Sequence, residues 1–263
     1  MIDYGIVTSA SKLMLDLDPR VRRGAASLVG SLIFIDVGRT NFNLIQENYN
    51  ILHLLAFDTD IEVKYLLTLY RKAVGWLLYR LSLHKDGVWM MIDSLTVDKM
   101  VEAFNKYFSP TKFQENQEYV VYLLEAFINC SMYDYGISHM LKSDLLFTMN
   151  YILVNENNVF GNKVSEGLFL QIRELILNVI KNTTLIKEGK AEAIKENLIY
   201  TISVFLSSDI EKEKLFSTSF YMSVSNSFEA KTQIANYIIE GKYIILEVDI
   251  YLIFRNCVNY WLI

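Results

Sequence analysis

Proline and glycine, the residues that most often interrupt helices, are scarce in this sequence. Its 263 residues include 2 prolines and 11 glycines. A chain built from strands needs more turn residues than this. Pro19 and Pro110 each follow a residue that can cap a helix, and proline fits the first helical turn. The composition therefore predicts an all-α protein.

Cysteine is rare as well. Cys130 and Cys257 lie in apolar helical stretches and share no spacing typical of metal ligands. We interpret both as buried small hydrophobic residues. The N-terminal stretch MIDYGIV has an early acidic residue and no basic run, which does not match a secretory leader. We therefore expect a reducing compartment such as the cytoplasm.

Long apolar runs and an excess of positive charge are missing. Charged residues interrupt every stretch before it reaches the roughly 18 apolar residues of a membrane-spanning helix. The formal net charge of −5 argues against nucleic-acid binding. The densest basic cluster, Arg20–Arg23, follows Asp16 and Asp18, and we interpret it as a helix face with its own counter-charges. We expect neither a membrane nor a nucleic acid as a partner.

Motifs for catalysis, cofactors and metals are missing too. The sequence contains no nucleotide-binding glycine loop, no HExxH and no GxSxG. The three histidines His53, His84 and His139 are far apart, and we interpret each as a partly buried or surface residue rather than a metal ligand. We therefore expect no enzyme, with no catalytic, cofactor-binding or metal-binding residues, no cofactor and no small-molecule substrate.

Two acidic pairs could suggest acid–base chemistry. Asp58 and Asp60 follow an apolar stretch in FDTDIEVK, and Glu211 and Glu213 follow another in LSSDIEKEK. Both pairs fall where one helix ends and the next begins, so their charges meet the positive end of a helix dipole. We interpret them as junction residues between repeats.

The sequence does contain a helical period along its whole length. Apolar residues recur three and four positions apart, for example within 21–32, 120–128 and 170–180. Four pairs mark helix starts by a capping side chain or a proline: Asp18-Pro19, Ser109-Pro110, Ser143-Asp144 and Ser208-Asp209. These signals predict many helices joined by short connections.

The helices also repeat. One recurrent helix begins near Tyr4, Tyr49, Val97, Leu145, Leu198 and Tyr243, at intervals of about 45 to 53 residues. A second helix and a short third segment follow each start. Each unit shows an apolar face that it cannot bury alone, so neighbouring units must stack. We predict a right-handed α-solenoid of about five repeats that forms a single domain over 1–263.

Glycines within the predicted helices suggest close packing. Gly30 and Gly75 each cost roughly 1 kcal/mol of helix propensity relative to alanine. A close helix crossing is the simplest account of both. We expect Gly24, Ala25 and Ala26 to serve such crossings as well.

At this point the residues resemble a known family. The stretch DPRVRRGAASLVGSL, 18–32, is similar to the second-helix signature of armadillo repeats, and ENYNILHLLAF, 47–57, is similar to their third helix. The family often has glycine at the position of Tyr49 or Asn50. The resemblance covers nearly the whole chain and implies a scaffold that docks other proteins within a large assembly. Armadillo proteins of nuclear import bind basic peptides through the motif W-x-x-x-N. That motif is not found here, because Arg80 follows Trp76 and Asp93 follows Trp89 at that spacing.

A finer resemblance concerns the N-terminal repeat. The order of features in DPRVRRGAASLVGSLIFIDVGRTNF, 18–42, resembles the radial spoke head protein 14 homologues of motile cilia. It implies a structural role in a radial spoke of the ciliary axoneme. The alternative is an armadillo or HEAT adaptor of the cytosol, in transport or signalling.

The residues that meet a partner are not identified by the sequence. Tyrosines cluster at the predicted unit junctions, namely Tyr65 with Tyr70, Tyr119 with Tyr122, and Tyr133 with Tyr135. Exposed tyrosines are favoured at protein interfaces, and buried ones belong to the core. The longest irregular stretch, Asn155–Gly167, is either a surface loop that meets a partner or a tolerated insertion.

Overall fold

The computed structural model describes residues 4–32, 35–43, 64–107, 113, 116–156, 159 and 165–239. Every regular element in these ranges is helical, so the predicted all-α solenoid fold is confirmed. The chain divides into two compact units, Met1–Ser143 and Asp144–Ile263. Within the described ranges, no helix is both long enough and apolar enough to cross a membrane.

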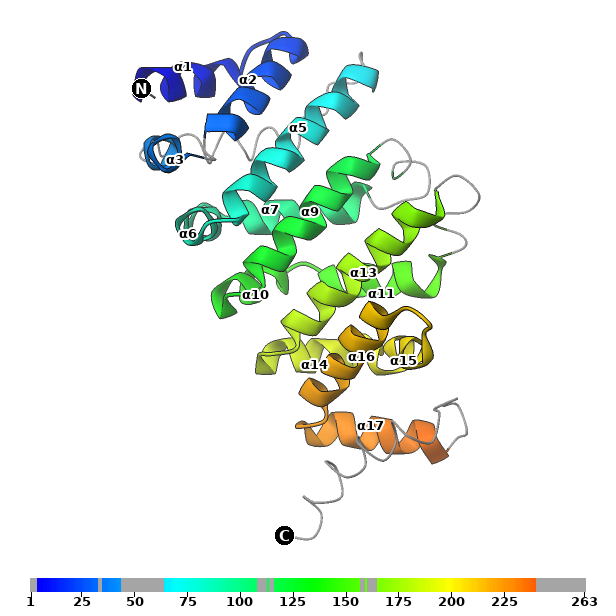
Figure 1. Ribbon diagram of the computed structural model, residues 1–263. Coiled ribbons are helices and arrows are strands. Elements are labelled where there is room, and N and C mark those ends of the chain that lie inside the picture. The colour runs from blue at the N-terminus through cyan, green and yellow to red at the C-terminus, as the bar shows by residue number, and fades with distance from the viewer. Residues whose placement is uncertain are drawn as a thin grey trace. The chain divides into compact units, whose positions relative to one another are not determined.

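The first unit consists of two kinds of helix that alternate. Its long helices lie side by side (Figure 1), and shorter helices connect them. In chain order the elements are α1 (Tyr4–Leu13), α2 (Pro19–Leu32), α3 (Asp36–Asn43), α5 (Lys64–Ser82), α6 (Lys85–Asp93), α7 (Thr96–Tyr107), α9 (Gln117–Cys130) and α10 (Asp134–Met140).

The second unit follows the same pattern. Its long helices α13 and α16 pack against each other. The elements are α11 (Leu145–Val154), α13 (Glu166–Thr183), α14 (Lys187–Lys195), α15 (Leu198–Ser203), the 3-10 helix η2 (Val204–Ser207), α16 (Glu211–Val224) and α17 (Phe228–Ile239).

The predicted repeat is confirmed where the structure describes it. The predicted starts at Tyr4, Leu145 and Leu198 are the first residues of α1, α11 and α15, and Val97 is the second residue of α7. Each is followed by a long helix and then a short one. The starts predicted near Tyr49 and Tyr243 lie outside the described residues, as do 47–57 and most of FDTDIEVK.

Close packing explains two of the helical glycines, as predicted. A Cβ added at Gly30 would lie 2.2 Å from the Trp76 ring, and one at Gly75 would lie 2.7 Å from the Tyr119 ring. These contacts join α2 to α5 and α5 to α9. Gly24 behaves differently, because it is exposed and an added Cβ would meet nothing within 4 Å. The prediction of a close crossing there was wrong.

A second glycine pattern lies in the short helices. Gly38, Gly87, Gly136 and Gly189 each face a backbone carbonyl six residues earlier, at the end of the preceding long helix. An added Cβ would lie 2.1, 2.2, 2.2 and 1.8 Å from the oxygens of Leu32, Leu81, Cys130 and Thr183. Real Cβ contacts are never this short. The tight corner between long and short helix therefore recurs in both units.

The predicted helix starts have mixed outcomes. Pro19 is the first residue of α2, and Oδ1 of Asp18 accepts a hydrogen bond from the Arg20 amide at 2.8 Å. Oγ of Ser208 accepts one from the Ile210 amide at 3.1 Å, but Ile210 is the N-cap residue of α16 and no side chain caps that helix. Asp144 precedes α11 but makes no capping bond, because its φ of 37° is left-handed instead of the extended conformation typical of a capping residue. Its predicted capping role was wrong, and Ser109-Pro110 lies outside the described residues.

The same left-handed conformation recurs before two further helices, α7 and α15. Leu95 before α7 has a φ of 58°, and Asn197 before α15 has a φ of 59°. Glycine is the residue that normally occupies such backbone positions. Leucine, aspartate and asparagine therefore occupy backbone positions here that glycine would adopt with less strain.

Candidate functional site

The long helices of the first unit present a row of half-exposed side chains. Trp76, Tyr79 and Arg80 belong to α5, and Tyr122 and Glu125 belong to α9. We call these five residues the α5–α9 face. Their spacings of three and four positions place each set along one side of its helix.

Ring contacts fix this face in position. The rings of Tyr79 and Tyr122 stack with centroids 6.0 Å apart and an interplanar angle of 23°. The Arg80 guanidinium lies 5.3 Å from the centre of the Trp76 ring, which in turn packs on Gly30 of α2. Because the rings are held by neighbours, they lose little freedom when something binds to them.

Polar contacts between α5 and α9 surround the face. Nδ2 of Asn129 donates to Oγ of Ser82 at 2.9 Å. Lys72 pairs with Glu118, and that hydrogen bond raises the pKa of Lys72. Burial is the main cause that raises the pKa of Tyr122. The two helices are therefore joined at several points along their length.

Glu125 differs from these charged neighbours. Its carboxylate is half-buried, and burial alone raises its pKa. In the part of the chain that the structure describes, no cation or hydrogen-bond donor pairs with it. A carboxylate that loses water without gaining a partner is costly, so this position favours a cationic group from outside the chain.

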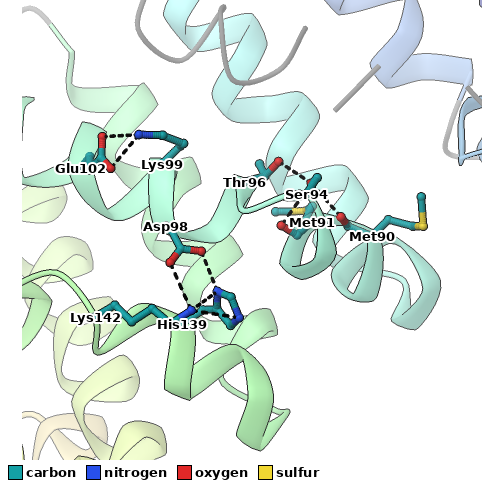
Figure 2. A network of polar contacts seen from close by, with 9 residues as sticks. All are labelled: Met90, Met91, Ser94, Thr96, Asp98, Lys99, Glu102, His139 and Lys142. Atoms are coloured by element: carbon teal, nitrogen blue, oxygen red, sulfur yellow. Dashed lines mark hydrogen bonds and ion pairs between the residues drawn. The ribbon is translucent and has the colours of Figure 1, made fainter. Parts of the chain in front are cut away.

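A polar network joins the short helices of the same unit (Figure 2). Nδ1 of His139, in α10, lies 2.6 Å from Oδ2 of Asp98, in α7. Nζ of Lys142 lies 3.7 Å from Oδ1 of Asp98. Nζ of Lys142 also lies 3.1 Å from Nδ1 of His139, so the three side chains form one network.

This network serves to connect helices. The hydroxyls of Ser94 and Thr96 lie 2.9 Å apart at the junction of α6 and α7, and Ser94 donates to the Met90 carbonyl at 2.7 Å. The hydroxyl nearest in sequence to His139, that of Ser138, donates to the backbone of Asp134. The contacts do not align a nucleophile with the histidine, as a triad would require.

Buried charge also connects the long helices of the second unit. Nε of Arg173, in α13, donates to Oε1 of Glu213, in α16, at 2.5 Å, and the Ser208 hydroxyl donates to Oε2 of Glu213 at 2.6 Å. The guanidinium lies 4.9 Å from the Phe169 ring centre and 5.4 Å from that of Phe205. Glu213 lies in the first turn of α16, at a helix start as predicted, but the sequence did not reveal that it is buried and paired.

The structure locates most of the cysteines and histidines that the sequence singled out. Cys130 is buried, as predicted, and burial raises its pKa to about 12, while Cys257 and His53 lie outside the described residues. His139 is buried beside Asp98, and His84 is half-buried. Among the residues that the structure describes, no three potential ligands cluster as a metal site would require.

The junction tyrosines differ in exposure. Tyr119 is core, Tyr122 and Tyr133 are half-buried, and Tyr135 is exposed. The side chains of Tyr65 and Tyr70 lie outside the described residues, as does part of Asn155–Gly167. Tyr119 and Tyr122 lie within α9, whereas Tyr133 and Tyr135 lie at the junction of α9 and α10 and at the start of α10.

Comparisons with known proteins support the fold. No family model matches the chain, and no curated protein matches it. Among solved structures, a computationally designed armadillo repeat protein for modular peptide recognition has a TM-score of 0.66 at 12% identity, covering 88% of this chain and 87% of its own. A designed armadillo repeat protein in complex with the peptide (KR)4 has a TM-score of 0.65 at 12% identity with the same coverage.

A further structure, described as an engineered protein, has a TM-score of 0.66 at 12% identity and covers 96% of this chain and 95% of its own. At these identities the likeness concerns the fold alone. The fold is therefore an armadillo-like helical solenoid, in agreement with the resemblance seen in the sequence.

Proposed function

We propose that the chain is a non-catalytic scaffold that binds an extended segment of another protein across the α5–α9 face. The observation that carries this proposal is Glu125, a half-buried carboxylate without a partner in the described residues, next to stacked tyrosine rings. A lysine or arginine of the bound segment would supply the missing charge. The adjacent rings would cover the aliphatic part of that side chain.

The surrounding charges limit how basic the segment can be. Arg80 and Lys72 are half-exposed on α5, so a run of positive charges would meet repulsion there. One cationic residue opposite Glu125, flanked by uncharged residues, suits the face better. This differs from the (KR)4 peptide bound by one of the similar designed proteins.

Glu125→Gln tests the proposal, with Glu118→Gln as the matched control. Both residues lie on α9 two turns apart, but Glu118 is exposed and already paired with Lys72. The probes are ten-residue peptides that carry a single arginine at varied positions among uncharged residues. Their binding is measured by fluorescence anisotropy. A charge-assisted hydrogen bond contributes about 1.5–3 kcal/mol.

We expect Glu125→Gln to weaken the best peptide by roughly tenfold or more, because about 1.4 kcal/mol corresponds to tenfold. Glu118→Gln should change the affinity less than twofold. Equal losses in both variants, or no peptide that binds better than its norleucine counterpart, would contradict the proposal.

The other parts of the assignment remain proposals. A single domain over 1–263, the lack of an enzymatic activity and the exclusion of nucleic acid, membrane and small-molecule partners rest on the sequence arguments. The similar designed proteins support a peptide-binding scaffold in general.

We further propose, from the stretch 18–42, that the scaffold belongs to a radial spoke of the ciliary axoneme. The comparisons add nothing to this resemblance. A tagged chain in ciliated cells tests it: enrichment in isolated axonemes, with loss of other spoke subunits when the gene is deleted, supports the assignment. A cytosolic distribution with normal ciliary beating favours the adaptor in transport or signalling.

A further inference from the structure

A second surface of the first unit combines exposed aromatic rings with unpaired carboxylates. Trp89 of α6 is 38% exposed, and Tyr135 of α10 is 57% exposed. The Trp89 ring centre lies 5.9 Å from that of Tyr135 and 6.2 Å from that of Tyr133. We call Trp89, Tyr133 and Tyr135 the aromatic edge. Its residues belong to the short helices and their junctions, not to the α5–α9 face.

The polar network below the edge holds it rigid. The Tyr135 ring lies 5.5 Å from the His139 ring, one helical turn further along α10. His139 is anchored by Asp98, and Lys142 closes the network (Figure 2). Because His139 is buried and anchored to α7, Tyr135 packs on a fixed support instead of moving freely. A fixed exposed ring can bind a ligand at a low entropic cost.

The exposed charges around the edge include more carboxylates than cations. Asp93 follows Trp89 by four residues in α6, which places both along one side of that helix, and Asp134 directly precedes Tyr135. Both aspartates are exposed, and neither has a partner among the described residues. Of the nearby lysines, Lys85 precedes Trp89 by four residues and so lies along the same side of α6 as Asp93, while Lys142 already faces Asp98.

Rings and carboxylates together match one kind of side chain. A guanidinium stacks on tryptophan and tyrosine faces and also forms paired hydrogen bonds with carboxylates. An ammonium group is more strongly hydrated and does not stack, so it uses only part of this surface. We propose that the aromatic edge binds an arginine side chain of a partner protein, stacked on Trp89 and Tyr135 and paired with Asp93 or Asp134.

This inference is independent of the α5–α9 face, which needs a cation opposite Glu125. The test uses the full chain labelled with 15N at the tryptophan indoles, so that Trp76 reports on one surface and Trp89 on the other. The probes are the blocked pentapeptide Gly-Ser-Arg-Ser-Gly and its analogues with citrulline or lysine in place of arginine. Citrulline keeps the shape of arginine but removes the charge.

We expect the arginine peptide to shift the Trp89 indole signal in a saturable way. The lysine peptide should bind at least threefold more weakly, and citrulline should give no saturable shift at the same concentration. Asp93→Asn combined with Asp134→Asn should weaken arginine binding at least threefold. Glu125→Gln should leave the shift of Trp89 unchanged, whatever its effect on the α5–α9 face.

Trp89→Phe serves as a second variant that keeps an aromatic ring, and Trp89→Leu removes it. Arginine binding, followed through the Asp93 and Asp134 amides of uniformly 15N-labelled samples, should persist in the first and be lost in the second. The proposal is overturned if citrulline binds as well as arginine, if the double aspartate variant binds normally, or if the Trp89 signal does not move.

Discussion

Replacing Gly136 with alanine should destabilise the first unit, although alanine is the better helix former. The added Cβ would lie 2.2 Å from the carbonyl oxygen of Cys130 and 3.0 Å from its carbonyl carbon. Both atoms belong to the backbone, so no side chain can rotate away. The corner between α9 and α10 would have to open by about an ångström to reach ordinary contact.

The net effect follows from two opposing terms. Overpacking of a buried position costs about 1–3 kcal/mol. The gain in helix propensity from glycine to alanine is about 1 kcal/mol. The expected loss in the free energy of unfolding is therefore roughly 0–2 kcal/mol, and the contact of 2.2 Å with a backbone oxygen places Gly136→Ala toward the upper end of that range. Gly24→Ala measures the gain in helix propensity alone, because an added Cβ there meets nothing within 4 Å. This variant should raise the free energy of unfolding by about 0.5–1 kcal/mol.

Native-state hydrogen exchange of the full chain measures both effects locally, which avoids the assumption that both units unfold together. Amides of α9 and α10 should lose protection in Gly136→Ala, and amides of α2 should gain protection in Gly24→Ala. The reasoning is refuted if Gly136→Ala protects α9 as well as the unmodified chain does.

Three further predictions concern single positions. Leu95→Asn should stabilise the chain by about 0.5–1 kcal/mol in urea unfolding, because asparagine tolerates φ 58° better than leucine, whereas Asn197→Leu should do the reverse. Glu213→Gln should cost up to about 3 kcal/mol, because Arg173 loses its nearer counter-charge and keeps only Glu156 at 3.4 Å, and a loss below about 1 kcal/mol would show that the pair is dispensable. Cys130 should resist alkylation at pH 9 and react only in denaturant, as mapped by mass spectrometry, because burial raises its pKa to about 12.

Periodicity made the repeat predictable, because each unit must bury one side of three helices. The starts at Tyr4, Leu145 and Leu198 follow from apolar spacing alone. The packing role of Gly30 and Gly75 was also predictable, since glycine inside a helix needs a reason. The sequence carries a further signal: one glycine recurs near the start of four short helices, where a close backbone approach requires it, whereas α17 has Ala230 at the corresponding place.

Other features depend on distances that the sequence does not contain. The pairing of Glu213 with Arg173 joins residues of different repeats, and the acidic residue alone matches a helix start equally well. The Asp144 side chain suits a helix cap, yet the left-handed backbone at that position excludes the usual capping geometry. The type of a side chain limits the roles that it can have, and the packing of the repeats determines which of these roles it takes.

The packing of the repeats also determines which carboxylates hold helices together and which remain available to a partner. Glu213 and Asp98 form contacts between helices, and Glu118 does so through its pair with Lys72. Glu125, beside stacked tyrosines, and Asp93, beside Trp89, have no such contact in the described structure. A carboxylate next to fixed rings is suited to a cation that also has an apolar body, which lysine and arginine both provide. The two proposed surfaces thus use the same chemistry on different helices, and the burial of the carboxylate distinguishes them. Glu125 is half-buried, so the cation that it accepts must lose water. Asp93 stays hydrated, so most of the recognition there comes from the rings.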